Sequence, residues 1–168
     1  MLRKFLFGSS YFCVQLWLGT TLFFSFILAP VLFKTFGGEM GADVMGALFP
    51  VYGILHLVCA AMGLVGLALA WRSRARIGGK TFRIGFTGLI TALAFAFAQA
   101  AYVFPRSHEL RVAVKAGRAA GSLDSIAPQM AEMMSLHRVS LGINNLLVIL
   151  VLLQVWVFYR VAREWDKA

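Results

Sequence analysis

The chain has 168 residues, of which 60% are hydrophobic and only 14% are charged, and its formal net charge is +9. A soluble domain carries about 25% charged residues, and a chain this short cannot hide so much apolar surface in one core. The composition therefore excludes an ordinary soluble domain and indicates a membrane protein. No soluble basic domain remains to bind nucleic acid, so we expect no such partner and attribute the positive charge to loops that orient helices in the lipid bilayer.

Four apolar runs follow one another along the chain, at residues 11–33, 51–71, 84–104 and 139–159. Each is close to the ~20 residues that a helix needs to cross ~30 Å of hydrocarbon, and a helix satisfies its own backbone polar groups in lipid. The basic start Arg3-Lys4 before a long first run favours an uncleaved anchor over a signal peptide. The sequence predicts a single integral membrane domain over residues 1–168, an all-α membrane protein folded as a four-transmembrane-helix bundle.

Two connectors, residues 34–50 and 105–138, are each expected to hold a short interfacial helix in an outer loop. Pro50 should end the first of these helices, because the residue before a proline resists the helical conformation. Gly121 should end the second, since glycine is the usual residue just past a helix end. The helix of the fourth span should start near residue 128, because Pro128 suits a first helical turn.

Lys and Arg residues are distributed unevenly between the two sides of this arrangement. Ten of the sixteen lie in the N-terminal segment, in the connector between spans two and three, and in the C-terminal segment. The positive-inside rule places these three segments in the cytoplasm. We therefore expect a multi-pass protein of the bacterial inner membrane with both termini in the cytoplasm.

Small residues recur every four positions in the third span, at Gly88, Ala92, Ala96 and Ala100. Such a stripe lets another helix approach closely in lipid. We interpret it as a packing surface and as an interface for a homo-oligomer.

Polar residues of the spans gather at one depth. His56, Gln99 and His137 fall in the outer half, and Ser140 and Asn144 follow His137 by three and seven residues on the same helical face. Polar side chains are costly in lipid, so we expect this intramembrane layer to point into the bundle. Its plainest interpretation is hydrogen bonding between helices, which contributes about 1 kcal/mol or less per contact.

Two more specific interpretations of the layer remain open. His56 and His137 could be axial ligands of a haem, in a membrane redox protein that binds haem or quinone. Thioether, thiol and imidazole groups also suit a soft metal ion, and the candidate ligands are Met130, Met133, Met134, His137, His56 and Cys59.

Signatures of enzymes are missing from the sequence, which has no phosphate-binding loop, nucleophile elbow, His-Glu-x-x-His or Cys-x-x-Cys motif. The four spans also contain no Asp or Glu for a proton relay. We therefore expect a protein that is not an enzyme and that binds or moves a small solute or a soft metal ion. A haem is the alternative; otherwise we expect no cofactor.

Three stretches carry a resemblance to a known family. They are Leu18-Gly19 through Ala29-Pro30-x-Leu32-Phe33 with Leu48-Phe49-Pro50-x-Tyr52, then Phe104-Pro105-Arg106, then Leu136-His137-Arg138-x-Ser140-x-x-x-Asn144. In their order and spacing they resemble the transmembrane protein 205-like family, also catalogued as domain of unknown function 4149, over nearly the whole chain. The resemblance implies a small four-span membrane protein. It marks as family-pattern positions Pro30, Phe49, Pro50, Pro105, Arg106, His137, Ser140 and Asn144.

Overall fold

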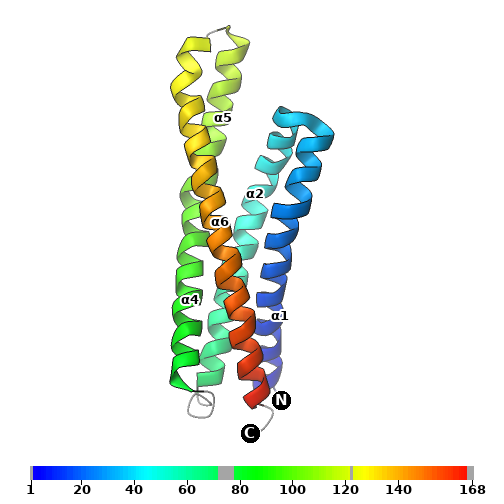
Figure 1. Cartoon of the computed structure of the whole chain (residues 1–168), viewed down its shortest axis with the longest axis vertical. Helices are drawn as coiled ribbons and strands as arrows, with labels where there is room; N and C mark the ends of the chain where they lie inside the picture. Colours follow the sequence, from blue (N-terminus) through cyan, green and yellow to red (C-terminus); the bar gives the residue numbers. More distant parts are fainter. Residues whose placement is uncertain (1, 72–77, 122, 166–168) are drawn as a thin grey trace.

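A computed structural model describes residues 2–71, 78–121 and 123–165 of the chain, with the side chains of all of these except residues 123–125 and 165. Every element in these ranges is helical (Figure 1). In chain order the elements are α1 (Leu2–Phe23), the π-helical turn η1 (Phe24–Leu28), α2 (Ala29–Ala70), α4 (Gly79–Ala98), the π-helical turn η3 (Gln99–Val103), α5 (Phe104–Ala119) and α6 (Leu123–Trp165). The all-helical prediction is confirmed.

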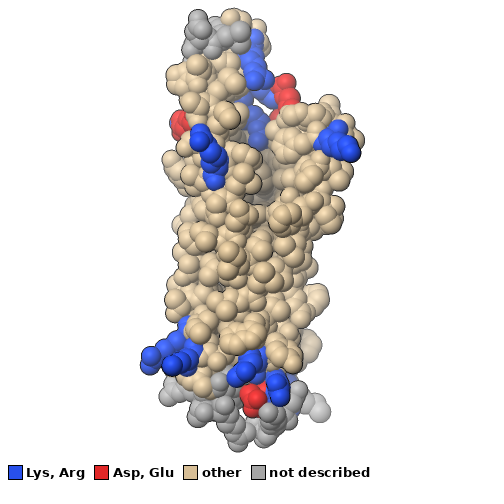
Figure 2. Space-filling model, in the orientation of Figure 1, with Lys and Arg blue, Asp and Glu red and all other residues tan. Residues whose placement is uncertain are grey.

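Three continuous helical stretches of the described chain are long and apolar enough to cross a membrane, judged by length and composition. They are Leu2–Ala70, Gly79–Ala119 and Ile126–Glu164. On the face shown in Figure 2, charged side chains lie toward the two ends of the molecule and leave an uncharged band between them. Many large apolar side chains are more than half exposed, which suits contact with lipid; they include Phe12, Ile54, Ile90, Phe97 and Ile149.

The first stretch reverses its direction at Gly37. This residue has φ 76° and ψ 176°, which is not helical, although the helix continues on both sides of it. Glycine adopts a positive φ at little cost because it has no Cβ atom. Figure 1 shows α1 rising to this turn and the greater part of α2 descending beside it.

The predicted separate interfacial helices are not confirmed, because both segments continue longer helical stretches. Pro50 lies inside α2, which runs on without a break to Ala70. Pro105 lies in the first turn of α5, which follows η3 and α4 directly. A proline removes only one backbone donor, and an apolar helix that is packed against its neighbours tolerates that loss.

The helices α5 and α6 form an antiparallel hairpin at the end of the molecule opposite its two termini (Figure 1). We call this end the outer end, after the orientation that the sequence predicts. As predicted, Gly121 follows the end of α5; its φ is 70° and its N–H donates to the carbonyl of Arg118 at 3.1 Å. The helix α6 begins at Leu123, five residues before the predicted start, so Pro128 lies inside it.

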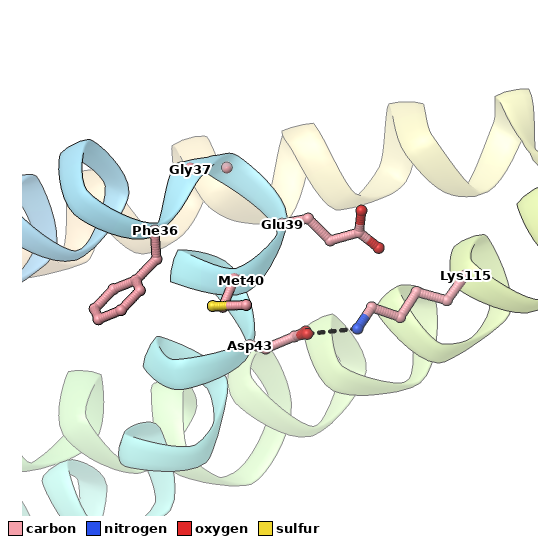
Figure 3. A pocket seen from close by; sticks show the side chains of 7 residues that line it. Phe36, Gly37, Glu39, Met40, Asp43 and Lys115 are labelled. Atoms are coloured by element: carbon pink, nitrogen blue, oxygen red, sulfur yellow. Dashed lines mark hydrogen bonds and ion pairs between the residues drawn. The ribbon is translucent and has the colours of Figure 1, made fainter.

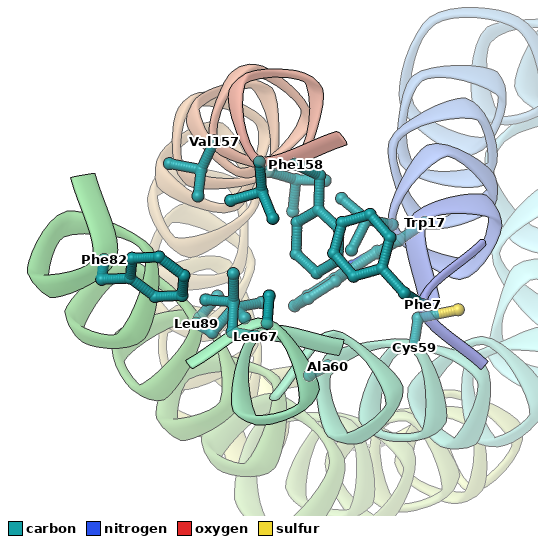
Figure 4. Packing of buried hydrophobic residues seen from close by; sticks show 14 of the residues in the cluster. Phe7, Trp17, Cys59, Ala60, Leu67, Phe82, Leu89, Val157 and Phe158 are labelled. Atoms are coloured by element: carbon teal, nitrogen blue, oxygen red, sulfur yellow. The ribbon is translucent and has the colours of Figure 1, made fainter. Parts of the chain in front are cut away.

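The core of the molecule lies between four helices, because α1 packs against both α2 and α6, and α4 packs against the same two. Figure 4 shows the large buried side chains that meet there, among them Trp17, Leu67, Leu89 and Phe158. Glycines allow the close approach of these helices. A Cβ atom at Gly66 would lie 2.5 Å from the Cβ atom of Ser10 and 2.8 Å from the ring of Phe158.

The predicted oligomer stripe packs inside this bundle. Gly88, Ala92 and Ala96 are buried within the chain, and Ala100 lies against Gly53 of α2. Within one chain the stripe therefore packs against neighbouring helices, as the packing interpretation predicts, and its use between copies stays a prediction.

Candidate functional site

Five polar side chains from four helical elements meet inside the bundle, and we call them the polar cluster. They are Thr21 of α1, Ser25 of η1, Tyr52 and His56 of α2, and Asn144 of α6. Their hydrogen bonds join segments that are between 35 and 119 residues apart in the sequence. The polar cluster therefore adds interhelical hydrogen bonds to the apolar contacts of the core.

His56 is 1% exposed and pairs through its Nε2 with the hydroxyl of Thr21 at 3.2 Å. The Thr21 hydroxyl has one proton, and it donates that proton to the carbonyl of Trp17 at 2.8 Å. Nε2 of His56 must then be the donor to Thr21, which leaves Nδ1 as an unprotonated acceptor. The rings of Trp17 and Tyr52 pack on the imidazole, with centroids 5.5 and 3.9 Å away.

Asn144 is the link between α6 and the α1–α2 pair. Its Oδ1 accepts from the Tyr52 hydroxyl at 3.3 Å, and its Nδ2 donates to the hydroxyl of Ser25 at 2.5 Å. The phenol ring of Tyr52 stacks on Phe24 with centroids 4.3 Å apart. Asn144 is only partly buried, so its amide lies at the edge of the cluster.

Both π-helical turns lie beside the polar cluster. Ser25 belongs to η1, and Gln99 begins η3. Gln99 is 2% exposed; its Nε2 donates to the backbone carbonyl of Ser140 at 3.3 Å, and its Oε1 has no partner among the described residues. Single π-turns inside α-helices occur often at functional sites, because the extra residue re-aims the side chains.

The structure places the other predicted site residues outside the polar cluster. His137 is exposed, which corrects the expectation that it points into the bundle. Ser140 contributes its carbonyl rather than its hydroxyl. Of the methionines, Met130 and Met133 are partly buried, and Met134 is 62% exposed.

The separation of His56 and His137 along the bundle rules out a shared iron atom. The hydrogen bond between Tyr52 and Asn144 sets the register of α2 and α6, which descend together in Figure 1. His137 precedes Asn144 by seven residues and His56 follows Tyr52 by four, so the two histidines lie roughly 16 Å apart along the axis. The described residues also contain no group of three or more His, Cys, Asp or Glu that could hold a metal ion.

The two cysteines are neighbours although they are far apart in the sequence. Cys13 of α1 packs against the core cluster that contains Cys59 of α2, and the two thiols are near neighbours. Both are free thiols. Cys59 lies about one turn below His56 on the same helix.

Charged residues surround the outer end of the bundle above the polar cluster. Arg106 donates hydrogen bonds to both carboxylate oxygens of Glu132, from Nε at 2.8 Å and from Nη2 at 3.0 Å. This ion pair links α5 to α6. The Arg106 guanidinium holds the pKa of the Glu132 carboxyl below its ordinary value. Lys115 of α5 pairs with Asp43 of α2 and lowers the pKa of that carboxyl in the same way.

A pocket of about 540 Å³ opens at this end, between the turn at Gly37 and α5 (Figure 3). It is lined by Phe36, Gly37, Gly38, Glu39, Met40, Asp43 and Lys115. Figure 2 shows the molecule hollowed here between its two outer lobes.

The family-pattern positions lie near this outer end. Phe49 stacks on Phe104 with centroids 4.5 Å apart and nearly parallel rings, while Pro30 and Pro105 each occupy a first helical turn. Sequence reasoning missed Tyr52 and the ion pair between Lys115 and Asp43. The signal for Tyr52 was a phenol within an apolar run; nothing in the sequence paired Lys115 with Asp43.

Comparisons with known proteins give a family and one relative. A family model described as "Domain of unknown function (DUF4149)" matches residues 12–116. A protein of Aquifex aeolicus (strain VF5), printed as "Uncharacterized protein", is 30% identical over 140 residues, which covers 83% of this chain and 86% of that protein. No solved structure matches.

Proposed function

Because the chain belongs to the family described as domain of unknown function (DUF4149), a name that carries no activity, we propose a function from the geometry of its interior. The protein crosses a bacterial inner membrane four times and binds a small neutral polar solute at the polar cluster. It performs no covalent chemistry on that solute.

The reversal at Gly37 supports the proposal of four crossings. The limb from Leu2 to this turn contains about 35 residues, which at ~1.5 Å per residue exceeds the ~30 Å of the hydrocarbon core. The limb from the turn to Ala70 is similar in length. Together with the stretches Gly79–Ala119 and Ile126–Glu164, these limbs make four crossings, and the outer parts of α5 and α6 extend beyond the lipid.

A neutral solute is favoured by the chemistry of the polar cluster. Its members offer hydroxyl, phenol, imidazole and amide groups, and none of them is an acid or a permanent cation. An ion that left water for this site would find no opposite charge to offset its desolvation. A molecule with its own hydroxyl or amide groups can instead exchange hydrogen bonds with water for hydrogen bonds with the cluster.

The observation that carries the proposal is the incomplete pairing of Asn144. Its side-chain amide can donate two hydrogen bonds and accept two, and it makes one of each inside the protein. Asn144 is also only partly buried. One donor and one acceptor therefore remain for a solute that enters from the hollow between the outer lobes.

The test compares Asn144→Ala with Asn145→Ala, a change of the same kind at the next, exposed position. Saturation-transfer NMR on protein in nanodiscs measures the binding of glycerol, acetamide and inositol, with tetramethylammonium as a charged comparator. We expect binding of at least one neutral probe by the wild type and by Asn145→Ala, and affinity at least about tenfold lower in Asn144→Ala, which is ~1.4 kcal/mol. Equal binding by the two variants at equal abundance would show that the cluster only joins helices.

A second candidate function is the binding of a soft metal ion by the thiols of Cys13 and Cys59. It is supported by their contact across α1 and α2, because two thiols suit Cu(I) and similar ions. Titration of the reduced protein with Cu(I), compared with Cys59→Ser, tests it; one ion bound by the wild type and none by the variant would support it. The haem alternative does not involve Cys13 and Cys59. Haem binding would require an absorption spectrum of the purified protein that shows a Soret band.

A further inference from the structure

Two fully buried polar side chains below the polar cluster have no hydrogen-bond partner among the described residues. Gln154 of α6 is 0% exposed, and neither its Nε2 nor its Oε1 is paired. Trp17 of α1 is also 0% exposed, and its indole Nε1 is unpaired. An unpaired buried polar group costs about 1–3 kcal/mol, so three such atoms in one core need a physical reason.

The two side chains lie at neighbouring levels of the bundle. The ring of Phe158 packs on Phe7 and Tyr11 with centroids 5.5 and 5.9 Å away, which sets the register of the antiparallel helices α1 and α6. Gln154 lies one turn above Phe158, and by this register its Cα level is within about one turn, ~6 Å, of that of Trp17. Helical side chains lean toward the N-terminus of their own helix, so Gln154 leans upward, toward the level of Trp17, whose ring also packs beside His56 with centroids 5.5 Å apart.

Glycine at position 88 makes room for the amide of Gln154. A Cβ atom on Gly88 of α4 would lie 2.2 Å from Nε2 of Gln154. The end of the Gln154 side chain therefore sits between α6 and α4. The walls around this level are apolar side chains of the buried core, including Val14, Leu89 and Val151.

We propose that Trp17 and Gln154 form an internal binding site for a water-sized neutral molecule, occupied by water in the resting protein. The indole N–H and the amide N–H donate to this molecule, and Oε1 of Gln154 accepts from it. Buried waters make about three hydrogen bonds to groups that would otherwise be unpaired, and these atoms supply that number. An ion does not fit, because no charged side chain belongs to the buried core at this level.

This site extends the hydrogen-bonding interior beyond the polar cluster. Ser10, Trp17, Thr21 and Ser25 are seven, four and four residues apart, so they share one face of the first helix. All but Ser25 are fully buried. The site is thus part of a row of polar groups along one face of the first helix. This row extends over 15 residues, or about 22 Å, which is most of the thickness of the hydrocarbon core.

The experiment detects water beside a single indole. The variant W71F/W156F/W165F keeps Trp17 as the only tryptophan, and it is labelled with ¹⁵N and placed in nanodiscs. We expect a nuclear Overhauser cross-peak between water and the Trp17 Nε1 proton, its loss in Gln154→Leu, and its retention in Gln15→Leu, where an exposed glutamine of α1 receives the same change. In the protein with all its tryptophans, Trp17→Phe identifies the same signal by its disappearance.

Thermal unfolding gives a second measurement. If the Gln154 amide is hydrogen-bonded to water, Gln154→Leu should leave the midpoint unchanged or lower it; if the amide is dry, the substitution should raise the midpoint, because it removes an unpaired buried group. A resolved indole signal without a water cross-peak, or a raised midpoint in Gln154→Leu, would overturn the proposal. Asn144→Ala should leave the cross-peak intact, so this site can fail or hold independently of the polar cluster.

Discussion

Thr20 and Thr21 are adjacent in α1, but Thr21 alone makes a hydrogen bond to another helix among the described contacts. The Thr20 hydroxyl donates to backbone carbonyls of its own helix, at 2.9 and 3.0 Å. The Thr21 hydroxyl is fully buried and also accepts from His56. Substitutions at Thr20 and Thr21 therefore distinguish what a hydrogen bond between helices contributes to stability from what a hydrogen bond within one helix contributes.

We predict that Thr21→Val destabilises the protein by about 1–3 kcal/mol, because the similar shape of valine preserves packing but leaves Nε2–H of His56 without an acceptor. Thr20→Val should change stability by less than about 0.5 kcal/mol. Unfolding in detergent, followed by circular dichroism, measures both. Equal effects of the two substitutions would mean that the bond between Thr21 and His56 contributes nothing.

The position of each polar residue along its helix could be predicted from the sequence. The direction in which its side chain points could be predicted only in part. His56, Gln99 and Asn144 all lie at the interior positions that their depth indicated. His137 shares a helical face with Asn144 and nevertheless is exposed. In Figure 1 the upper part of α6 leaves α1 and α2 and continues beside α5, so the environment of its face changes along the helix.

Among the helices, contact is closest where glycine replaces a side chain. We predict that Gly66→Ala destabilises the bundle by about 1–3 kcal/mol, because the new methyl group would meet Ser10 and Phe158. Gly142→Ala is the matched control, since nothing lies within 4 Å of its Cβ position; helix propensity alone should make it neutral or stabilising by up to ~1 kcal/mol. Thermal midpoints in the same detergent test both, and a smaller loss at Gly66 than at Gly142 would contradict the packing shown in Figure 4.

The outer hairpin should loosen in acid. The pKa of Glu132 is lowered in the folded protein, mainly by the hydrogen bond from Arg106. A carboxyl whose folded pKa is depressed contributes stability above its unfolded pKa, and this contribution is lost as the pH falls through the folded pKa. We therefore expect the midpoint of thermal unfolding to fall from pH 7 toward pH 4 and below, and to fall less in Glu132→Gln.

Amide hydrogen exchange in α5 locates this effect. At acidic pH, after correction for the intrinsic exchange rate, protection should decrease in α5 of the wild type and remain low at all pH values in Glu132→Gln. If α5 keeps its protection at low pH in both proteins, the bond between Arg106 and Glu132 does not hold the hairpin.

The sequence predicted some helix boundaries correctly and others incorrectly. Apolar runs and the stop at Gly121 predicted helical segments where the structure has them. Pro50 and Pro105 suggested boundaries where the helices run on, because a proline disfavours a helix locally while packing on both sides of it favours one. The sequence did not show which of the adjacent glycines, Gly37 or Gly38, makes the turn. Only the backbone conformation distinguishes them, because Gly37 has the positive φ.

The whole molecule has two different ends. Figure 1 places the beginning of α1 and the end of α6 at one end, and the turns at Gly37 and Gly121 at the other. At the second end, Arg106 pairs with Glu132 and Lys115 pairs with Asp43. The α6 helix has 43 residues, so at ~1.5 Å per residue it is about twice as long as the hydrocarbon core is thick. We therefore expect the outer hairpin to extend beyond the lipid.

This asymmetry predicts the orientation of the protein. Segments rich in Lys and Arg near the ends of a span are retained in the cytoplasm, while a loop of mixed charge is exported more easily. Alkaline phosphatase, which is active only outside the cytoplasm, should therefore be active when inserted after Gly121 and inactive when fused to the C-terminus. Green fluorescent protein at the C-terminus should fluoresce, since it does not mature after export in an unfolded form. Phosphatase activity at the C-terminus together with its absence after Gly121 would invert the topology, and would place the polar cluster in the cytoplasmic half of the membrane instead of the outer half.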